Sequence, residues 1–458
     1  MSKFEFKMGS TGLARMIAVA AVAFSLLFAA TAAHATIPGE TGSNFNLTAS
    51  AAYVTLPDGG SVYAWGYGVT GSPIGMQLPG PTLIVTAGTT VRVTLTNQLP
   101  AAAGNVSIVF SGQKVTVDPL NPGVTGLLTQ EATPGGGTVT YTFTASEPGT
   151  YLYHSGTRPD LQVEMGLFGA LIVRPAGATF ASCAYAHAAT CFDREYLFVL
   201  SEVDPAIHRA VEAQASGPGP ITVATEPYHS KYWMINGRSA PDTMKEPIDP
   251  LLPHQPYNIM PRMHPGERLL MRVVGAGREM HPYHFHGNHA QVLARDGRLI
   301  LSATDPTKLA GPQLFTIASL PGGTVDAIYE WTGKDLGWDI YGDRAHTCNG
   351  LLWQPGQAPM PSAGYDPVTK EWCPDHGAHL PAQVPDPYVM TNGALYSGTP
   401  YMGSLAQLPP GQGGMNPNGG FTYMWHSHTE REMTNNDVFP GGMMTMLIIE
   451  PPGVQIMQ

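Results

Sequence analysis

Short runs of alternating apolar and polar residues recur along most of the chain. Residues 138–144 carry apolar side chains at every second position, and residues 79–96 contain two such runs separated by a turn at Ala87-Gly88. Side chains of a β-strand point alternately to opposite faces, so this period predicts half-buried strands. Further runs occupy residues 150–154, 167–174, 194–201, 232–238, 266–272, 326–331, 421–425 and 443–450. The pattern predicts an all-β protein.

The runs fall into two groups. We expect one β-sandwich domain over residues 45–176, a connector of small residues over 177–193, and a second domain over 194–452. Between about 342 and 420 the alternation fails in a stretch rich in Pro, Gly and Met. Loops of this length are usually functional or poorly ordered, so this stretch is predicted to be a long insertion in the second domain.

The first 35 residues differ from the rest. Three basic residues precede an apolar run over 16–30, and Ala33-His34-Ala35 forms a small-residue cleavage site. This arrangement predicts a signal peptide over residues 1–35 and export to the periplasm or the extracellular space. No later segment is apolar enough to predict a stable membrane span.

Composition agrees with an exported all-β protein. Only 12% of residues are charged, whereas Gly (53) and Pro (42) are abundant, as in proteins with many turns. The net charge of −11 disfavours nucleic acid as a partner. Four cysteines fit two disulfides; three pairings are possible, and nearest-neighbour pairing is the simplest. They are Cys183, Cys191, Cys348 and Cys373.

Two histidine pairs are the strongest chemical signal. His284 with His286, and His426 with His428, each have His-x-His spacing inside a predicted strand. Both members of such a pair point to the same face, and imidazole pairs suit copper, zinc and iron. The isolated histidines are predicted to have no metal role; they are His187, His208, His229, His254 and His346. His376 and His379 are a weaker candidate for a surface site.

The two domains are predicted to be repeats. Residues 149–157 match residues 420–429 with one extra residue, and each segment precedes a Gly-rich turn and an apolar strand. Residues 106–112 occupy the place of residues 281–287.

Four of these segments resemble the copper motifs of the multicopper oxidase superfamily. They are Pro79-Gly-Pro-Thr82, Gly149-Thr-Tyr-Leu-Tyr-His-Ser155, His281-Pro-Tyr-His-Phe-His-Gly287 and Trp425-His-Ser-His428. The resemblance covers nearly the whole chain after the signal peptide. It implies two cupredoxin-like Greek-key sandwiches, the same domain count as in two-domain laccases and copper nitrite reductases. It also implies copper as the cofactor.

The family's trinuclear cluster uses eight histidines, and this chain keeps five at matching positions. These are His154, His284, His286, His426 and His428, whereas Val109, Ser111 and Gly156 stand at the other three. The resemblance implies that His154 and His428 face one copper position and that His286 and His426 face its neighbour.

The family's blue copper site is predicted to be lost. Ser427 stands where the Cys ligand is expected, and Glu432 stands at the downstream His position. His281 remains, and Met443 or Met444 matches the axial ligand. Serine supplies no thiolate, so no blue centre is expected.

Three alternative functions fit a cluster that keeps five of the eight histidines. The first is a copper-dependent oxidoreductase that takes electrons directly from a small-molecule reductant and has an open copper position for oxygen, superoxide or nitrite. The second is a non-catalytic copper carrier or tolerance protein, which the insertion methionines Met390, Met402 and Met415 would assist. The third is a surface or structural protein on a degenerate oxidase fold. A homo-oligomer that shares ligands between subunits also stays open.

Overall fold

The computed structural model describes residues 37–334, 336–337, 339, 341, 345–378, 398–399, 421–450 and 453–456. The predicted signal peptide, His379 and the three insertion methionines lie outside the described residues.

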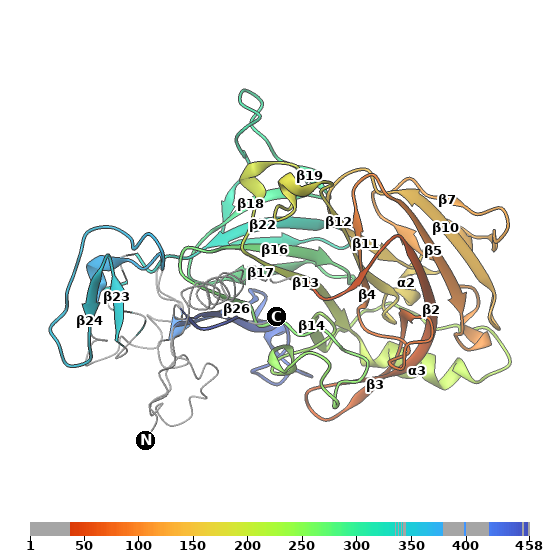
Figure 1. Ribbon diagram of the computed structural model, residues 1–458. Helices are drawn as coiled ribbons and strands as arrows, with labels where there is room; N and C mark the ends of the chain where they lie inside the picture. Colours follow the sequence, from red (N-terminus) through yellow and green to blue (C-terminus); the bar gives the residue numbers. More distant parts are fainter. Residues whose placement is uncertain are drawn as a thin grey trace, which may run out of the picture. The chain divides into compact units, whose positions relative to one another are not determined.

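The first sandwich consists of two five-stranded sheets (Figure 1). One sheet has the order β1 (Glu40–Thr41), β4 (Gly80–Thr86), β12 (Phe168–Arg174), β11 (Gly149–His154), β6 (Val109–Phe110). The other has the order β3 (Ser61–Val69), β2 (Asn44–Thr55), β5 (Thr90–Asn97), β10 (Thr138–Thr144), β7 (Thr116–Val117). Between β7 and β10 in the sequence, β8 (Val124–Thr125) and β9 (Gln130–Glu131) form a short hairpin. Leu47 and Val93 from one sheet and Leu171 from the other are buried in a single core.

The second sandwich also has two sheets. The first contains β14 (Tyr232–Ile235), β13 (Arg194–Val203), β16 (Arg268–Gly275), β22 (Thr324–Glu330), β18 (Ala290–Arg295), β19 (Arg298–Leu299) and β20 (Gln313–Leu314). The second contains β15 (Arg262–Met263), β27 (Met444–Ile449), β26 (Phe421–Ser427), β17 (His281–Phe285), β21 (Thr316–Ser319) and β25 (Gly398–Thr399). Phe198, Tyr283 and Trp425 pack in the core between them. The fold is therefore all-β, as predicted.

Helices are few and short among the described residues. The α-helices are α2 (Pro159–Gln162) and α3 (Pro205–Ala215), and the 3-10 helices are η1 (Ala101–Ala103), η2 (Ala178–Phe180), η3 (Ala188–Thr190), η4 (Asp242–Met244), η5 (Cys373–Asp375) and η7 (Glu430–Met433). The alternating pattern of the sequence did not predict α3. Its signal was present, because Asp204 accepts a hydrogen bond from the amide of Ala206 at the N-cap and Pro205 follows.

Strand pairing follows the predicted repeat. β11 pairs with β12 and β6, and β26 pairs in the same way with β27 and β17. The registers place His154 opposite Val109 in the first sandwich and His426 opposite His284 in the second. The sequence alignment of the two repeats is confirmed at these positions.

A buried polar network connects the two sandwiches. The fully buried Arg272 of β16 donates from Nε to Glu195 Oε1 at 2.6 Å and from Nη1 to Thr150 Oγ1 at 2.9 Å. Thr150 in turn donates to Asp326 at 2.6 Å, and Glu195 pairs with Arg174 of β12. Apolar residues of both sandwiches surround this network, including Leu152, Ile172, Val199 and Val274.

Both disulfides follow nearest-neighbour pairing. Cys183 is bonded to Cys191, and Cys348 is bonded to Cys373. The second disulfide joins β23 (His346–Cys348), which pairs with β24 (Leu351–Trp353), to η5. The described part of the predicted insertion is thus ordered around this crosslink.

Candidate metal centre

Three histidines converge on one face of the second sandwich. β17 and β26 are neighbouring strands, and the alternation buries Tyr283 and Phe285 in the core while His284 faces away from it. His426 lies directly opposite His284 in the register. A ligand nitrogen from each of His284, His286 and His426 lies within 4.8 Å of those of the other two.

The closest approach is between His286 and His426. Their Nε2 atoms are 3.0 Å apart, and the ring centroids are 5.1 Å apart. The ring of His284 lies 4.6 Å from that of His286 and 5.4 Å from that of His426. His286 and His426 therefore face each other, as the resemblance implied.

Contacts on the far side of two rings orient their nitrogens. His426 Nδ1 donates to the carbonyl oxygen of Ser427 at 2.7 Å, which leaves the Nε2 lone pair directed at the cluster in the neutral ring. His284 Nδ1 lies 2.7 Å from the Thr316 hydroxyl. Metal-binding histidines usually have their second nitrogen held in this way. The donors present fit a metal ion.

Burial keeps these imidazoles neutral. Desolvation, with smaller repulsion from His426 and His428, lowers the pKa of His284 to about 4. Desolvation also lowers the pKa of His426 below its ordinary value. Neutral imidazole is the form that binds metals, so no proton has to be removed from either residue near neutral pH.

His428 lies at the exposed edge of the cluster. Its ring is 4.9 Å from that of His284 and 5.7 Å from that of His426, but its side chain is 56% exposed. Its Nδ1 lies 3.5 Å from a carboxylate oxygen of Glu430. His428 is adjacent to the three convergent residues without belonging to the tight group.

The structure does not bring His154 to this cluster. Along β11, Thr150 and Leu152 share a face with His154, and both of them lie in the contact with the second sandwich. The cluster instead lies on the face of the β17–β26 sheet that points away from the core. His154 Nδ1 contacts the backbone carbonyl of Ser155 at 2.9 Å. The shared position implied for His154 and His428 is therefore not formed by the described residues of one chain.

His281 has a different environment from the cluster. It is fully buried, and its two nitrogens lie 2.9 Å from Glu202 Oε2 and 2.9 Å from Glu432 Oε2. Desolvation opposes charge, but these two carboxylates outweigh it and raise the pKa of His281 to about 9. A charged imidazolium has no lone pair for a metal, so this geometry favours an ion pair. Met443 is buried in the core and Met444 is half-buried beside it.

Of a second cluster, which consists of Asp339, His346, Glu371 and His376, sequence reasoning named only His376 and predicted no metal role for His346. His376 is fully buried rather than at the surface, and its neighbours in the cluster come from three separate segments. No regular spacing connects these residues, so no strand or helix period could have pointed to them.

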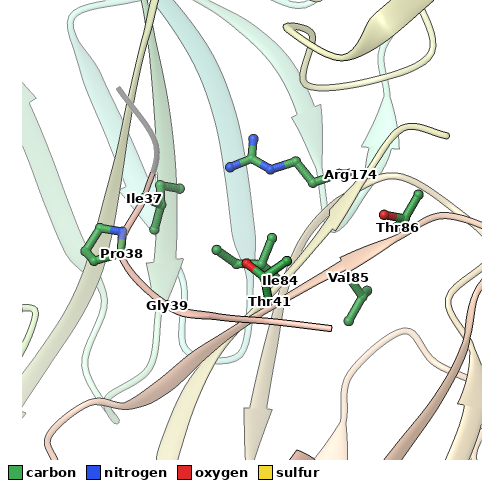
Figure 2. A pocket seen from close by; sticks show the side chains of 8 residues that line it. All are labelled: Ile37, Pro38, Gly39, Thr41, Ile84, Val85, Thr86 and Arg174. Atoms are coloured by element: carbon green, nitrogen blue, oxygen red, sulfur yellow. The ribbon is translucent and has the colours of Figure 1, made fainter. Parts of the chain in front are cut away.

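A pocket lies elsewhere in the described part of the chain, beside β1 and β4. Its volume is about 400 Å³, and none of the eight residues that line it, drawn in Figure 2, is a histidine. Arg174 reaches its wall, where it is already paired with Glu195. The pocket therefore adds no donor to the histidine cluster.

Part of the first sandwich is similar to known proteins of one family. Residues 66–178 match the multicopper oxidase family. L-ascorbate oxidase of Brassica rapa subsp. pekinensis is 40% identical over 97 residues, which are 21% of this chain and 16% of that protein. These similarities support the multicopper oxidase superfamily for this chain. Among its members, multicopper oxidase MCE of Talaromyces pinophilus is 38% identical over 99 residues, or 22% of this chain and 15% of the relative.

A solved member of the superfamily has the same fold. The blue copper oxidase of Nitrosomonas europaea aligns with 90% of this chain and 86% of its own, with a TM-score of 0.51 and 20% identity. Copper is the metal of these relatives by name, in agreement with the predicted cofactor. The chain aligns with only about one sixth of the length of the curated relatives above. Among the helices of the described residues, none has the length and apolarity to cross a membrane.

Proposed function

We propose that this protein is an exported copper-dependent oxidoreductase whose copper is held by His284, His286 and His426. The observation that carries the proposal is the convergence of three imidazoles whose ligand nitrogens lie within 4.8 Å of one another. His428 supplies a fourth, exposed donor at the edge. Bound copper would provide one-electron chemistry between Cu(II) and Cu(I).

The residues around the cluster support access from solvent. His428 is more than half exposed, and Phe315, whose ring lies 5.7 Å from that of His284, is 53% exposed. The carbonyl of Ser427 and the hydroxyl of Thr316 fix the imidazoles, while the open side admits a small molecule. A reductant can therefore approach the cluster directly.

The absence of a blue centre is part of the proposal. Ser427 offers a hydroxyl where a thiolate is needed, and its Oγ accepts a hydrogen bond from the amide of Thr429 at 3.2 Å. His281 and Glu432 are paired with each other at 2.9 Å. Both features support electron delivery by a small-molecule reductant in solution instead of transfer from a second copper in the chain.

The same observations also support a copper carrier. The exposed His428 can exchange a metal with another molecule, and a chain without a blue centre lacks the internal electron route of its relatives. A carrier would release Cu(I) to a competing chelator without turnover. Tight copper whose spectrum changes with a reductant would support the oxidoreductase instead.

Copper content and EPR on the exported chain test the proposal. We expect one copper per chain with a non-blue signal, and its loss in the double variant His284→Ala/His426→Ala. His229→Ala is the matched control, because it removes an imidazole outside the cluster. Copper that survives the double variant, or that also disappears in the control, would contradict the assignment of these ligands.

A further inference from the structure

The described part of the insertion contains a compact group of four metal-binding side chains. Asp339, Glu371 and His376 are 6%, 5% and 0% exposed, and His346 is half-buried. One ligand atom from each of the four lies within 4.8 Å of the other three. The group comes from a different part of the chain from the copper cluster, and it shares no residue with it.

The separations match a tetrahedral ion. His346 Nε2 lies 2.8 Å from Asp339 Oδ2, 3.2 Å from Glu371 Oε1 and 3.1 Å from His376 Nδ1. His376 Nδ1 lies 3.3 Å from Glu371 Oε1 and 3.9 Å from Asp339 Oδ2. Ligands about 2.0–2.2 Å from a zinc ion at tetrahedral corners stand about 3.3–3.6 Å apart. The five separations run from 2.8 to 3.9 Å and bracket that range.

Contacts outside the group prepare its atoms for a metal. His376 Nε2 donates to the carbonyl of Leu351 at 3.0 Å, which leaves the Nδ1 lone pair directed at the group in the neutral ring. The amide of Gly377 donates to Asp339 Oδ2 at 2.7 Å and the amide of Tyr341 donates to Oδ1 at 2.9 Å, which fixes that carboxylate. Glu371 Oε2 is buried without a hydrogen-bond partner among the described residues.

The charge of the group calls for a cation. Two buried carboxylates face each other, and the ion pairs recorded for them in the described part of the chain are all with His346 and His376. Isolated buried carboxylates are costly, whereas a divalent cation with two carboxylates and two neutral imidazoles has no net charge. A small hollow lined by Asp339, Glu371 and Asp375 adjoins the group.

The geometry points to a structural zinc site formed by Asp339, His346, Glu371 and His376. Four protein ligands with no open position are typical of structural rather than catalytic zinc. His346 lies two residues before Cys348 and His376 lies three residues after Cys373, so the ion would reinforce the disulfide that connects these segments. The site would hold the insertion in its described conformation (Figure 1).

Zinc content of the full exported chain tests this site. Protein stripped with a chelator is reloaded with Zn²⁺, and a parallel sample is reloaded with Co²⁺ to record the absorption bands of tetrahedral cobalt. We expect one zinc per chain that persists in His284→Ala/His426→Ala. His346→Ala should lose this zinc ion, and Glu371→Gln should bind it at least tenfold more weakly. The control variant His229→Ala should retain it.

The outcomes separate this inference from the proposed function. Zinc that disappears in the His284→Ala/His426→Ala variant but persists in His346→Ala would place the ion in the copper cluster and overturn the second site. If His346→Ala does not fold by circular dichroism, Glu371→Gln decides, because it retains the shape of the side chain. Unchanged zinc affinity in that variant, or cobalt without tetrahedral bands, would also overturn the inference.

Discussion

The two sandwiches have the same strand pairing around equivalent motifs but place different side chains on them. In the second, His426 stands opposite His284 and a third imidazole approaches both. In the first, His154 stands opposite Val109 and has only a backbone carbonyl at its Nδ1. The scaffold therefore does not create a metal site by itself; donors on two paired strands are needed.

A second difference concerns the first residue of the equivalent segments. Val106 is fully buried in an apolar core, whereas His281 is fully buried between Glu202 and Glu432. The second sandwich has thus exchanged an apolar contact for a three-residue ion-pair network. The two differences should affect folding stability and copper binding to different degrees.

Replacing His281 should have the largest effect. His281→Ala leaves Glu202 and Glu432 buried without their partner, which typically costs about 3–5 kcal/mol of folding free energy. Val106→Ala at the equivalent position removes only apolar volume and should cost about 2 kcal/mol. Urea denaturation of both variants measures this difference, and equal losses would contradict the assigned role of the ion pair.

The same histidine predicts a dependence of stability on pH. Its pKa is raised to about 9 in the folded protein, above the ordinary 6.5, so the charged form stabilises the fold. That contribution is fully present below pH 6.5 and is lost as the pH rises through 9, a change of about 3 kcal/mol. The free energy of unfolding should therefore decrease from pH 6 to pH 7.5 and again from pH 7.5 to pH 9. A His281→Gln variant should have a flatter profile, and an identical slope in both proteins would contradict this explanation.

Transplanting donors should give the first sandwich a copper site. Val109→His/Ser111→His adds one imidazole directly opposite His154, where side chains lie close together, and a second one just after β6. We expect a second copper ion per chain in this variant, with an affinity at least tenfold higher than any copper binding of the unmodified first sandwich. Metal titration followed by EPR gives the answer, provided that circular dichroism shows a native fold. An unchanged copper total would show that paired donors are insufficient.

Removing His154 should have the smallest effect. Its ring contacts a carbonyl of its own turn, so His154→Ala should change unfolding free energy by less than about 1 kcal/mol and leave copper content unchanged. Copper analysis beside His284→Ala/His426→Ala checks this contrast. Loss of copper in His154→Ala would mean that the first sandwich contributes a ligand in the functional protein.

Local patterns predicted much of the fold and part of the candidate site. The period of two located β10 and put His284 on the same face as His286. The family resemblance implied that His426 faces His286, and nearest-neighbour pairing gave both disulfides. The contacts of His281 were not predictable, since Glu202 is 79 residues away and no motif relates the two. Most of the group around His376 was missed for the same reason, because no motif or strand period relates its four residues, although His346 begins β23. Long-range charge pairing has no sequence period.

The buried Arg272 has a consequence for how the molecule unfolds. Its guanidinium touches Glu195 of its own sandwich and Thr150 of the other, and separating the sandwiches would take Thr150 from Arg272 and Arg174 from the buried Glu195. Neither half can lose its structure without exposing this shared network, so partial opening along that boundary is unfavourable. Heating should therefore give a single calorimetric transition for the two sandwiches, and either half produced alone should lack cooperative melting.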